Sequence, residues 1–389
     1  MKAQELLKAA KAIQPEIQAN RRELHKHPEL GLDMVFTKSF VWSKLEEMGY
    51  EPQDCGEGGI VAIVGGKNPG KCFLLRADMD ALPIEEQANV DFRSEHPGKM
   101  HACGHDTHTA MLLGAAKLLK DMEDEIQGTV KLMFQPGEEI ALGAKVMIDA
   151  GILENPKVDA AMMIHSLSGL PLPSGLMLVI EGGYGMASCD QYKITVKGKG
   201  GHGSMPEMAI DPITAAAHIH IGLAEIHSRE LASTAFGVIT TGVFRAEGAP
   251  NIIADEAVME GTIRSGSEEV EKMLMARVTE IAENIGKAYR CEVKVEFVKH
   301  CPPMIVDDAV SADAFRYTKE LLGDMAASIS MIANGAKIGP GSEDFAFISS
   351  RVPSVAMNFA TTQADDDGVC WGQHHPKVRF DDSKLFHGS

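Results

Sequence analysis

The sequence predicts an α/β fold with two parts: a mixed, largely parallel sheet and, inserted into it, a ferredoxin-like α+β unit. Three observations lead to this prediction. The 389 residues exceed what one hydrophobic core usually holds. Short apolar runs alternate with helical patterns up to about residue 180, which is typical of a parallel sheet covered on both faces. Near Gly182-Gly183 the pattern changes to strands with a period of two.

The sheet should contain five buried strands, four from the first part of the chain and one from near its end. They are the runs GIVAIVGG (59–66), CFLLRADMDA (72–81), TVKLMFQPGEE (129–139), DAAMMIH (159–165) and, much later, SVAMNFA (354–360). The segment 108–122 is too rich in apolar residues for a surface helix and suits a helix packed on a sheet. The first seventeen residues read as an amphipathic helix.

The inserted part has the element order β-α-β-β-α-β, which is the split βαβ arrangement. The expected elements are a strand at 191–201, a helix at 211–228, strands at 235–244 and 257–265, a helix at 268–288 and a strand at 291–300. We therefore predict one domain from residues 1–182 and 300–389 and a second from residues 183–299.

Composition excludes several classes of function. The chain has 37 basic and 55 acidic residues, a net charge of −18, which argues against nucleic acid or an anionic membrane as a partner. Its seven cysteines lack the spacing of a disulfide framework, so reduced thiols in the cytoplasm are expected. The N-terminal helix has no apolar core or cleavage site of a signal peptide, and no run of about eighteen apolar residues occurs.

Metal-binding types of side chain follow the predicted strands. The segment MHACGHDTH (100–108) holds three imidazoles, one thiol and one carboxylate just before a predicted helix. Asp80 follows the second strand, Glu138 and Glu139 follow the third, His165 ends the fourth, and His374 lies in the loop after the last. Because ligands bind beyond the carboxyl ends of such strands, these segments should meet at one edge of the sheet.

Each of these residues alone is more often a turn former, a helix cap or a small buried thiol, but their joint occurrence favours a catalytic metal centre. Two ions need five or six ligands, and five are available: Cys103, His105, Glu139, His165 and His374. A thiolate of Cys103 is the expected bridge between the ions. Glu138 could act as general base and acid, and Asp80 could accept a hydrogen bond from a ligand imidazole and fix its tautomer.

Seven motifs run in the same order as in a known family over nearly the whole chain. They are RRELHKHPELG (21–31), LRADMDALP (75–83), MHACGHD (100–106), QPGEE (135–139), GGHGSMP (200–206), GSEDF (341–345) and HHP (374–376). With them the chain resembles the dinuclear metallopeptidases that include aminoacylases, glutamate carboxypeptidases and diaminopimelate desuccinylases. It is most similar to their amidohydrolase subgroup, which holds hippurate hydrolases, auxin-conjugate amidohydrolases and aminobenzoyl-glutamate hydrolases.

The resemblance implies a hydrolase of N-acyl or aroyl amino acids with two divalent ions per subunit, of Zn, Mn, Co or Ni. It implies that residues 1–182 and 300–389 are the catalytic domain and that residues 183–299 are a lid through which a homodimer, or a larger tetramer, forms. The five ligands above and Glu138 as the base match the family pattern. That pattern has the last ligand two residues before a proline, which selects His374 over His375.

Further roles are implied for the lid. His202 resembles a residue that reaches the active site of the other subunit and polarises the scissile carbonyl, while Asn251 and Arg264 resemble residues that meet the substrate. The residues alone leave a structural role for Asn251 and Arg264 open. The resemblance also implies a C-terminal helix after residue 382, so this sequence is either naturally short or truncated at Ser389.

Three alternatives remain beside the amidohydrolase. A dipeptidase or carboxypeptidase on the same scaffold would share the metals and the base. A catalytically silent metal-binding relative would not need Glu138, and a structural zinc site would favour paired cysteines, which this sequence lacks. Nothing resembles the nucleophile elbow of a serine hydrolase.

Overall fold

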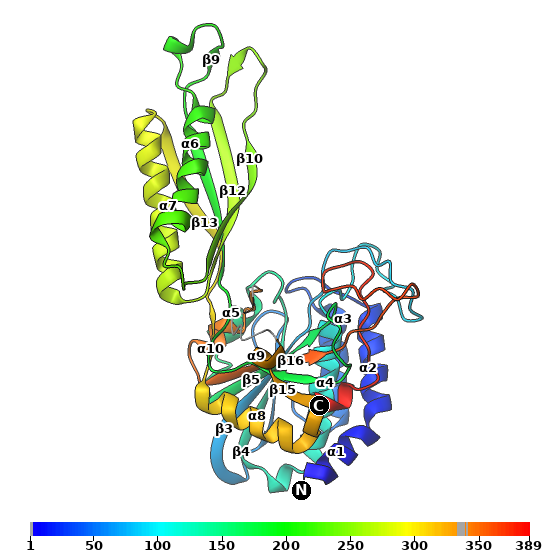
Figure 1. The fold of residues 1–389 in the computed structure, drawn as a ribbon. Helices are drawn as coiled ribbons and strands as arrows, with labels where there is room; N and C mark the ends of the chain where they lie inside the picture. The colour runs from blue at the N-terminus through cyan, green and yellow to red at the C-terminus, as the bar shows by residue number, and fades with distance from the viewer. Residues whose placement is uncertain (1–2, 333–338, 340) are drawn as a thin grey trace. The chain divides into compact units, whose positions relative to one another are not determined.

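The computed structural model describes residues 3–332, 339 and 341–389 (Figure 1). Among these, residues 3–185, 305–332 and 344–389 form one compact unit, and residues 186–304, 339 and 341–343 form another. We call them unit 1 and unit 2. The chain enters and leaves unit 2 near two short strands, β7 (Gly183–Met186) and β14 (Met304–Val306). The predicted division at residues 183 and 299 into a catalytic and a lid domain stays a prediction.

Unit 1 contains a mixed, largely parallel sheet, as the sequence predicts, and this sheet has eight strands. In spatial order its strands are β1 (Gln53–Asp54), β2 (Ile60–Gly65), β4 (Gln127–Gln135), β3 (Asn68–Asp78), β5 (Ala160–Leu167), β16 (Ser354–Ala360), β6 (Met177–Val179) and β15 (Ala326–Ser328). The four central strands β4, β3, β5 and β16 are mutually parallel. The carboxyl ends of these four strands therefore lie at the same edge of the sheet.

Helices cover the sheet of unit 1 (Figure 1). They are α1 (Ala3–Ala12), α2 (Gln14–Lys26), α3 (Val35–Glu47), α4 (His105–Asp121), α5 (Gly143–Asp149), α8 (Asp308–Leu322), α9 (Ile329–Ile332) and α10 (Ala346–Ser349). The central helix α4 is buried over most of its length, which agrees with the prediction of a helix packed on a sheet. Its Leu113 and Ala116 join Val41 of α3 and Ile60 and Leu132 of the strands in one apolar core.

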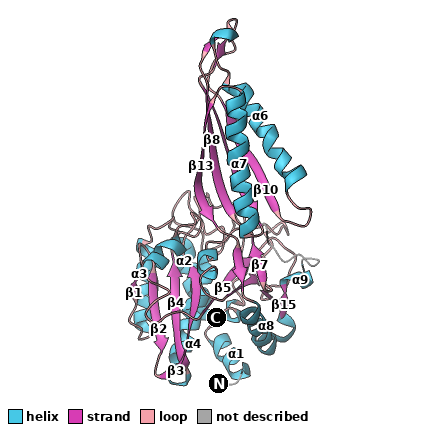
Figure 2. Cartoon of the chain, turned by 90° about the vertical axis from the view of Figure 1, so that its left-hand side faces the viewer, coloured by secondary structure: helices cyan, strands magenta, loops and turns pink. Residues whose placement is uncertain are grey.

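Unit 2 has the predicted β-α-β-β-α-β order. Its elements are β8 (Cys189–Lys197), α6 (Pro212–Glu225), β10 (Gly237–Arg245), β12 (Glu256–Ser265), α7 (Glu268–Ala288) and β13 (Glu292–Cys301). The antiparallel sheet runs β10-β12-β8-β13, and α6 and α7 pack on one face of it (Figure 2). Tyr192, Ile194 and Val196 alternate along β8 and fill the core beneath the two helices. A small pair, β9 (Gly201–His202) and β11 (Ile252–Ile253), completes the unit.

Two details of the sheet in unit 1 differ from the predictions. His165 was predicted to end its strand but lies inside β5, because β5 stays paired with β16 as far as Leu167. The run 59–66 forms β2, which is antiparallel to β4, so the parallel part of the sheet ends there. In the described part of the chain, no helix combines the length and apolar composition that a bilayer-spanning segment needs.

Candidate metal centre

The segment that holds Cys103 and His105 turns sharply into α4. Gly104 between them has a φ of +91°, a conformation that glycine adopts without strain. A Cβ at this position would lie 2.9 Å from the ring of Phe380. The turn therefore needs glycine, and it brings the side chains before and after it to the edge where the parallel strands end.

His105 is held with one ring nitrogen turned inward. Its Nδ1 lies 2.9 Å from the carbonyl oxygen of Asp80, so Nδ1–H donates and Nε2 is left as the lone-pair nitrogen. Nε2 is buried, has no hydrogen-bond partner, and lies 3.6 Å from Oδ2 of Asp78 and 3.9 Å from Oε1 of Glu139. This arrangement suits a metal ligand whose tautomer is fixed from behind.

Asp80 fixes the tautomer of His105, but not, as expected from the sequence, through its carboxylate. Its main-chain carbonyl accepts the imidazole N–H, while its carboxylate oxygens accept the backbone N–H groups of Glu138 and Glu139 at 3.0 and 3.1 Å. Asp80 thus ties the loop after β3 to the loop after β4. It is a positioning residue for three neighbours at once.

Cys103 and His165 face one another across the site. Nδ1 of His165 donates to the carbonyl of Ser166 at 2.7 Å, so Nε2 is free of a proton and lies 3.6 Å from Sγ of Cys103. Burial, and then the neighbouring His108, lower the pKa of His165 to about 3, which keeps the imidazole neutral. A neutral imidazole nitrogen beside a sulfur is a suitable pair of ligands for a transition metal.

Glu139 and His374 complete the group. Oε1 of Glu139 lies 3.5 Å from Nε2 of His374. His374 has a φ of +65°, which is uncommon for a residue other than glycine, and its N–H donates to the carbonyl of Ala102 at 2.8 Å. The local strain is of the kind found where a side chain is held for function.

All five predicted ligands come together, although they start from four separate segments. The ligand atoms of Cys103, His105 and His165 lie within 4.8 Å of one another, and so do those of Cys103, Glu139 and His374. Cys103 belongs to both groups. Glu138 joins His105 and Glu139 in a third group, and its Oε1 accepts a 3.4 Å hydrogen bond from the backbone N–H of Asp344.

The electrostatics of the site fit a bound cation. Burial raises the pKa of the Cys103 thiol well above its usual range, so a positive charge is needed to make it a thiolate. Burial also raises the pKa of Glu139. Although burial opposes it, Asp78 raises the pKa of His105, whose buried Nε2 would then carry a proton that no acceptor satisfies. A divalent ion would satisfy all three groups.

A buried polar network that the sequence did not reveal supports the site from below. Arg76, in the apolar run of β3, donates to Asp78 at 2.8 Å, to Gln135 at 2.8 Å and to Asp344 at 3.0 Å. Although burial opposes ionisation, Arg76 and then His105 and His108 lower the pKa of Asp78 well below its usual range. The signal in the sequence was a charged residue inside a strand that is otherwise apolar.

Both ring nitrogens of the nearby His108 make hydrogen bonds. Its Nε2 accepts from the backbone N–H of Ser166 at 2.6 Å, so Nδ1 carries the proton and donates to Asp78 at 2.5 Å. Both nitrogens are therefore engaged. His108 positions Asp78, while His105, one turn earlier on α4, points its unpaired nitrogen at the site.

A second buried network anchors the start of α4. Nε of Arg21 lies 2.8 Å from the carboxylate of Asp106 and forms an ion pair with it. Nδ1 of His25 donates to Asp106 at 2.7 Å, and Nε2 of His25 lies 3.2 Å from Glu86. Although burial opposes it, Arg21 and His25 lower the pKa of Asp106 below its usual range. Arg21 and His25 of the motif at 21–31 thus support Asp106, the residue next to His105.

The three predicted lid residues belong to unit 2. His202 on β9 and Asn251 are neighbours, because the N–H of Gly203 donates to the carbonyl of Asn251 at 2.8 Å. Strand β12 begins at Glu256, five residues after Asn251, and Arg264 lies near its opposite end. Eight residues of extended strand separate Glu256 from Arg264, which is a distance of about 26 Å. Within unit 2 the structure therefore brings His202 and Asn251 together and leaves Arg264 apart from them.

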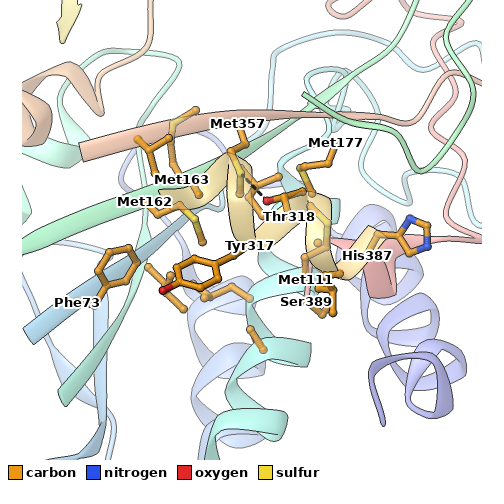
Figure 3. Close-up of a pocket in the computed structure, with 18 of the residues that line it drawn as sticks. Phe73, Met111, Met162, Met163, Met177, Tyr317, Thr318, Met357, His387 and Ser389 are labelled. Carbon is orange, nitrogen blue, oxygen red and sulfur yellow. Dashed lines mark hydrogen bonds between the residues drawn. The ribbon is translucent and has the colours of Figure 1, made fainter. Parts of the chain in front are cut away.

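A methionine-rich cavity in unit 1 is a different feature from this site. It has a volume of about 610 Å³ and lies between the sheet and helices α4 and α8 (Figure 3). Its wall is rich in methionine and includes Met111, Met162, Met177 and Met357, with Tyr317 from α8. None of the five predicted ligands lines it, so this cavity is separate from the candidate metal centre.

The geometry above can be set beside known proteins. The model of peptidase family M20/M25/M40 matches residues 74–387 of this chain. The chain belongs to this family. An N-acetylcysteine deacetylase of Bacillus subtilis is 36% identical over 97% of this chain and 95% of its own length. A hippurate hydrolase of Campylobacter jejuni is 38% identical over 80% of each chain.

A solved structure from Bacillus subtilis, described as a dinuclear metal-binding peptidase of the M20 family, has the same fold. It is 33% identical, covers 97% of each chain and superposes with a TM-score of 0.80. Membership of the M20 family and these relatives confirm the predicted class of enzyme, a metal-dependent amidohydrolase on an α/β scaffold. The identity of each ligand, the metal and the substrate remain to be proposed from the site.

Proposed function

We propose that this protein hydrolyses the amide bond of N-acyl or aroyl amino acids and releases a carboxylic acid and a free amino acid. The observation that carries the proposal is the pair of ligand groups that share Cys103, with the carboxylate of Glu138 beside them. The deacetylase and hippurate hydrolase relatives support acyl amino acids as the substrate class.

The proposed metal ligands are those predicted from the sequence: Cys103, His105, Glu139, His165 and His374. Two divalent ions held there would supply positive charge that polarises the amide carbonyl and acidifies water. The shared position of Cys103 supports a role as the bridging ligand. Its thiolate and the imidazoles suit Zn, Co or Ni, and the carboxylate also suits Mn.

Glu138 is the proposed general base and acid. Its backbone is fixed by Asp80, and its Oε1 accepts from the N–H of Asp344, so the carboxylate has a defined orientation. It takes a proton from the attacking water and later gives it to the departing amine. No covalent bond between the chain and the acyl group is needed.

His202 is proposed to polarise the scissile carbonyl, and its local contacts support this role. The backbone N–H of Ser204 donates to Nδ1 of His202 at 3.2 Å, so the proton of the neutral ring lies on Nε2 and can be donated. We propose that His202 acts on the site of a second subunit in a cytoplasmic homodimer. Asn251, beside it, and Arg264 are proposed to contact the substrate.

Turnover of a substrate panel separates this function from its alternatives. We expect chelator-sensitive release of free amino acid from N-acetyl, N-benzoyl, indole-acyl or aminobenzoyl amino acids in the presence of Mn²⁺ or Zn²⁺, with restoration when metal is returned. Preference for dipeptides would assign the chain to the peptidases instead. Bound metal without any turnover would favour a catalytically silent relative.

Subunit mixing tests the role of His202 across a dimer. His202→Ala and Glu138→Gln homodimers should each be nearly inactive, but heterodimers would contain one site with both native residues. We therefore expect mixing to restore activity, up to about half of the native value per heterodimer if sites are independent. Heterodimers that form, as judged by mass spectrometry, yet stay inactive would contradict a role in trans.

A further inference from the structure

Three side chains of unit 2 that the proposed function does not use converge at one end of its sheet. They are Asp190 on β8, Glu271 in the first turn of α7 and His300 on β13. Asp190 and His300 are paired directly across the two strands. Helix α7 packs on the same face and adds Glu271 from above, so three elements distant in sequence supply the group.

The ligand atoms of this group are close enough together to meet at one ion. Nδ1 of His300 lies 2.7 Å from Oδ1 of Asp190 and 3.6 Å from Oε1 of Glu271. The three ligand atoms all lie within 4.8 Å of one another. Ligand atoms bound tetrahedrally to one ion at 2.0–2.2 Å are separated by about 3.4 Å, so small side-chain adjustments would bring all three to one ion.

The burial of the two carboxylates is unfavourable without a cation. Asp190 is fully buried and Glu271 is 4% exposed. Oε1 of Glu271 is buried and has no hydrogen-bond partner, although it points at the other two ligand atoms. Burial, and then the charge of Asp190, raise the pKa of Glu271 to about 7, which expresses the cost of placing two negative charges together.

We propose that Asp190, Glu271 and His300 form a binding site for a divalent first-row metal ion such as Zn²⁺, separate from the candidate catalytic centre. Two carboxylates and one imidazole are a ligand set of this chemistry, and an ion of charge +2 would offset both carboxylates. The side chain of His300 is 50% exposed, so water can reach the site and complete the coordination.

An ion at this site would join the first strand, the second helix and the last strand of unit 2. It would bind the folded unit and not the unfolded chain, where the three residues are up to 110 positions apart. Binding should therefore raise the unfolding temperature of unit 2 as the concentration of free metal rises. We assign the ion a structural role, because it would link three elements of unit 2 that are distant in sequence.

The test is metal stoichiometry of the full-length protein. The protein would be stripped with a chelator, re-equilibrated with a small excess of Zn²⁺, separated from free metal and analysed for ions per chain. We expect the His300→Ala and Glu271→Gln variants each to hold one ion fewer than the native protein. Zn²⁺ should also raise their unfolding temperature less. His220→Ala, which removes another exposed imidazole of unit 2, is the matched control and should bind like the native protein.

The outcomes separate this site from the catalytic one. The His300→Ala and Glu271→Gln variants should hydrolyse acyl amino acids as the native protein does. Cys103→Ala should lose activity. The double variant Cys103→Ala/His300→Ala should hold one ion fewer than Cys103→Ala. If the native protein and both variants hold equal numbers of ions, the proposal is wrong, whatever the activity. Should His300→Ala fold poorly, Glu271→Gln, which keeps the shape of the side chain, decides.

Discussion

Glu138→Gln should lower kcat for the best acyl amino acid by at least about a hundredfold while the protein keeps its metal. The amide has the shape of the carboxylate and can still accept a hydrogen bond from the N–H of Asp344, but it cannot take a proton from water. Loss of general acid–base assistance usually costs a hundredfold to ten-thousandfold. Steady-state kinetics with each substrate, together with metal analysis of the same sample, would measure both quantities.

The control for this variant is Glu51→Gln, which makes the same chemical change at an exposed position of unit 1 and should leave kcat unchanged. The pH dependence gives a second readout, since the acidic limb of kcat/KM reports the base in the free enzyme. Near-native turnover in Glu138→Gln would remove this residue from the role of base. Loss of activity together with loss of metal would instead indicate that Glu138 helps to hold the ions.

Arg76→Ala should be among the most destabilising single substitutions in unit 1. The guanidinium is buried between Asp78 and Asp344, at 2.8 and 3.0 Å, and both carboxylates are fully buried. Removing it leaves two uncompensated charges in the interior, which typically costs about 3–5 kcal/mol. Because a domain is stable by only about 5–15 kcal/mol, we expect a large fall in the unfolding midpoint in urea.

Arg316→Ala is the matched control for Arg76→Ala. Arg316 also pairs with an aspartate, Asp313, at 2.7 Å, but both side chains are more than half exposed. Such surface pairs contribute at most about 1 kcal/mol. If Arg76→Ala were as mild as Arg316→Ala, the charge network beneath the metal centre would not be the support that its geometry indicates.

The sequence was most informative where residue types are chemically restricted. Helix α7 has the predicted bounds 268–288, because a serine cap and a regular apolar face mark it. The five ligands lie together because strand ends carry them to one edge. Helices α2, α3 and α8 were not predicted. Their packing depends on distant parts of the chain.

The supports of the site could not be predicted, for a physical reason. Whether Arg76 pairs with Asp344 depends on two segments 268 residues apart. Likewise, the sequence favoured His105 over His108 as a ligand but did not reveal the contact that separates them, which is the hydrogen bond from the backbone N–H of Ser166 to His108. Hydrogen bonds to the main chain leave no trace in the side-chain pattern.

The contacts of Asp80 bear on how inactive relatives could be recognised. Its carboxylate serves the backbone N–H groups of residues 138 and 139, and any residue other than proline offers such a group. A descendant that had lost the base would therefore still need Asp80 to hold the loop. An aspartate at position 80 therefore indicates the same loop structure, whether or not the relative is active. A glutamate at position 138 indicates that the general base is present. Only position 138 should be used to separate active relatives from inactive ones.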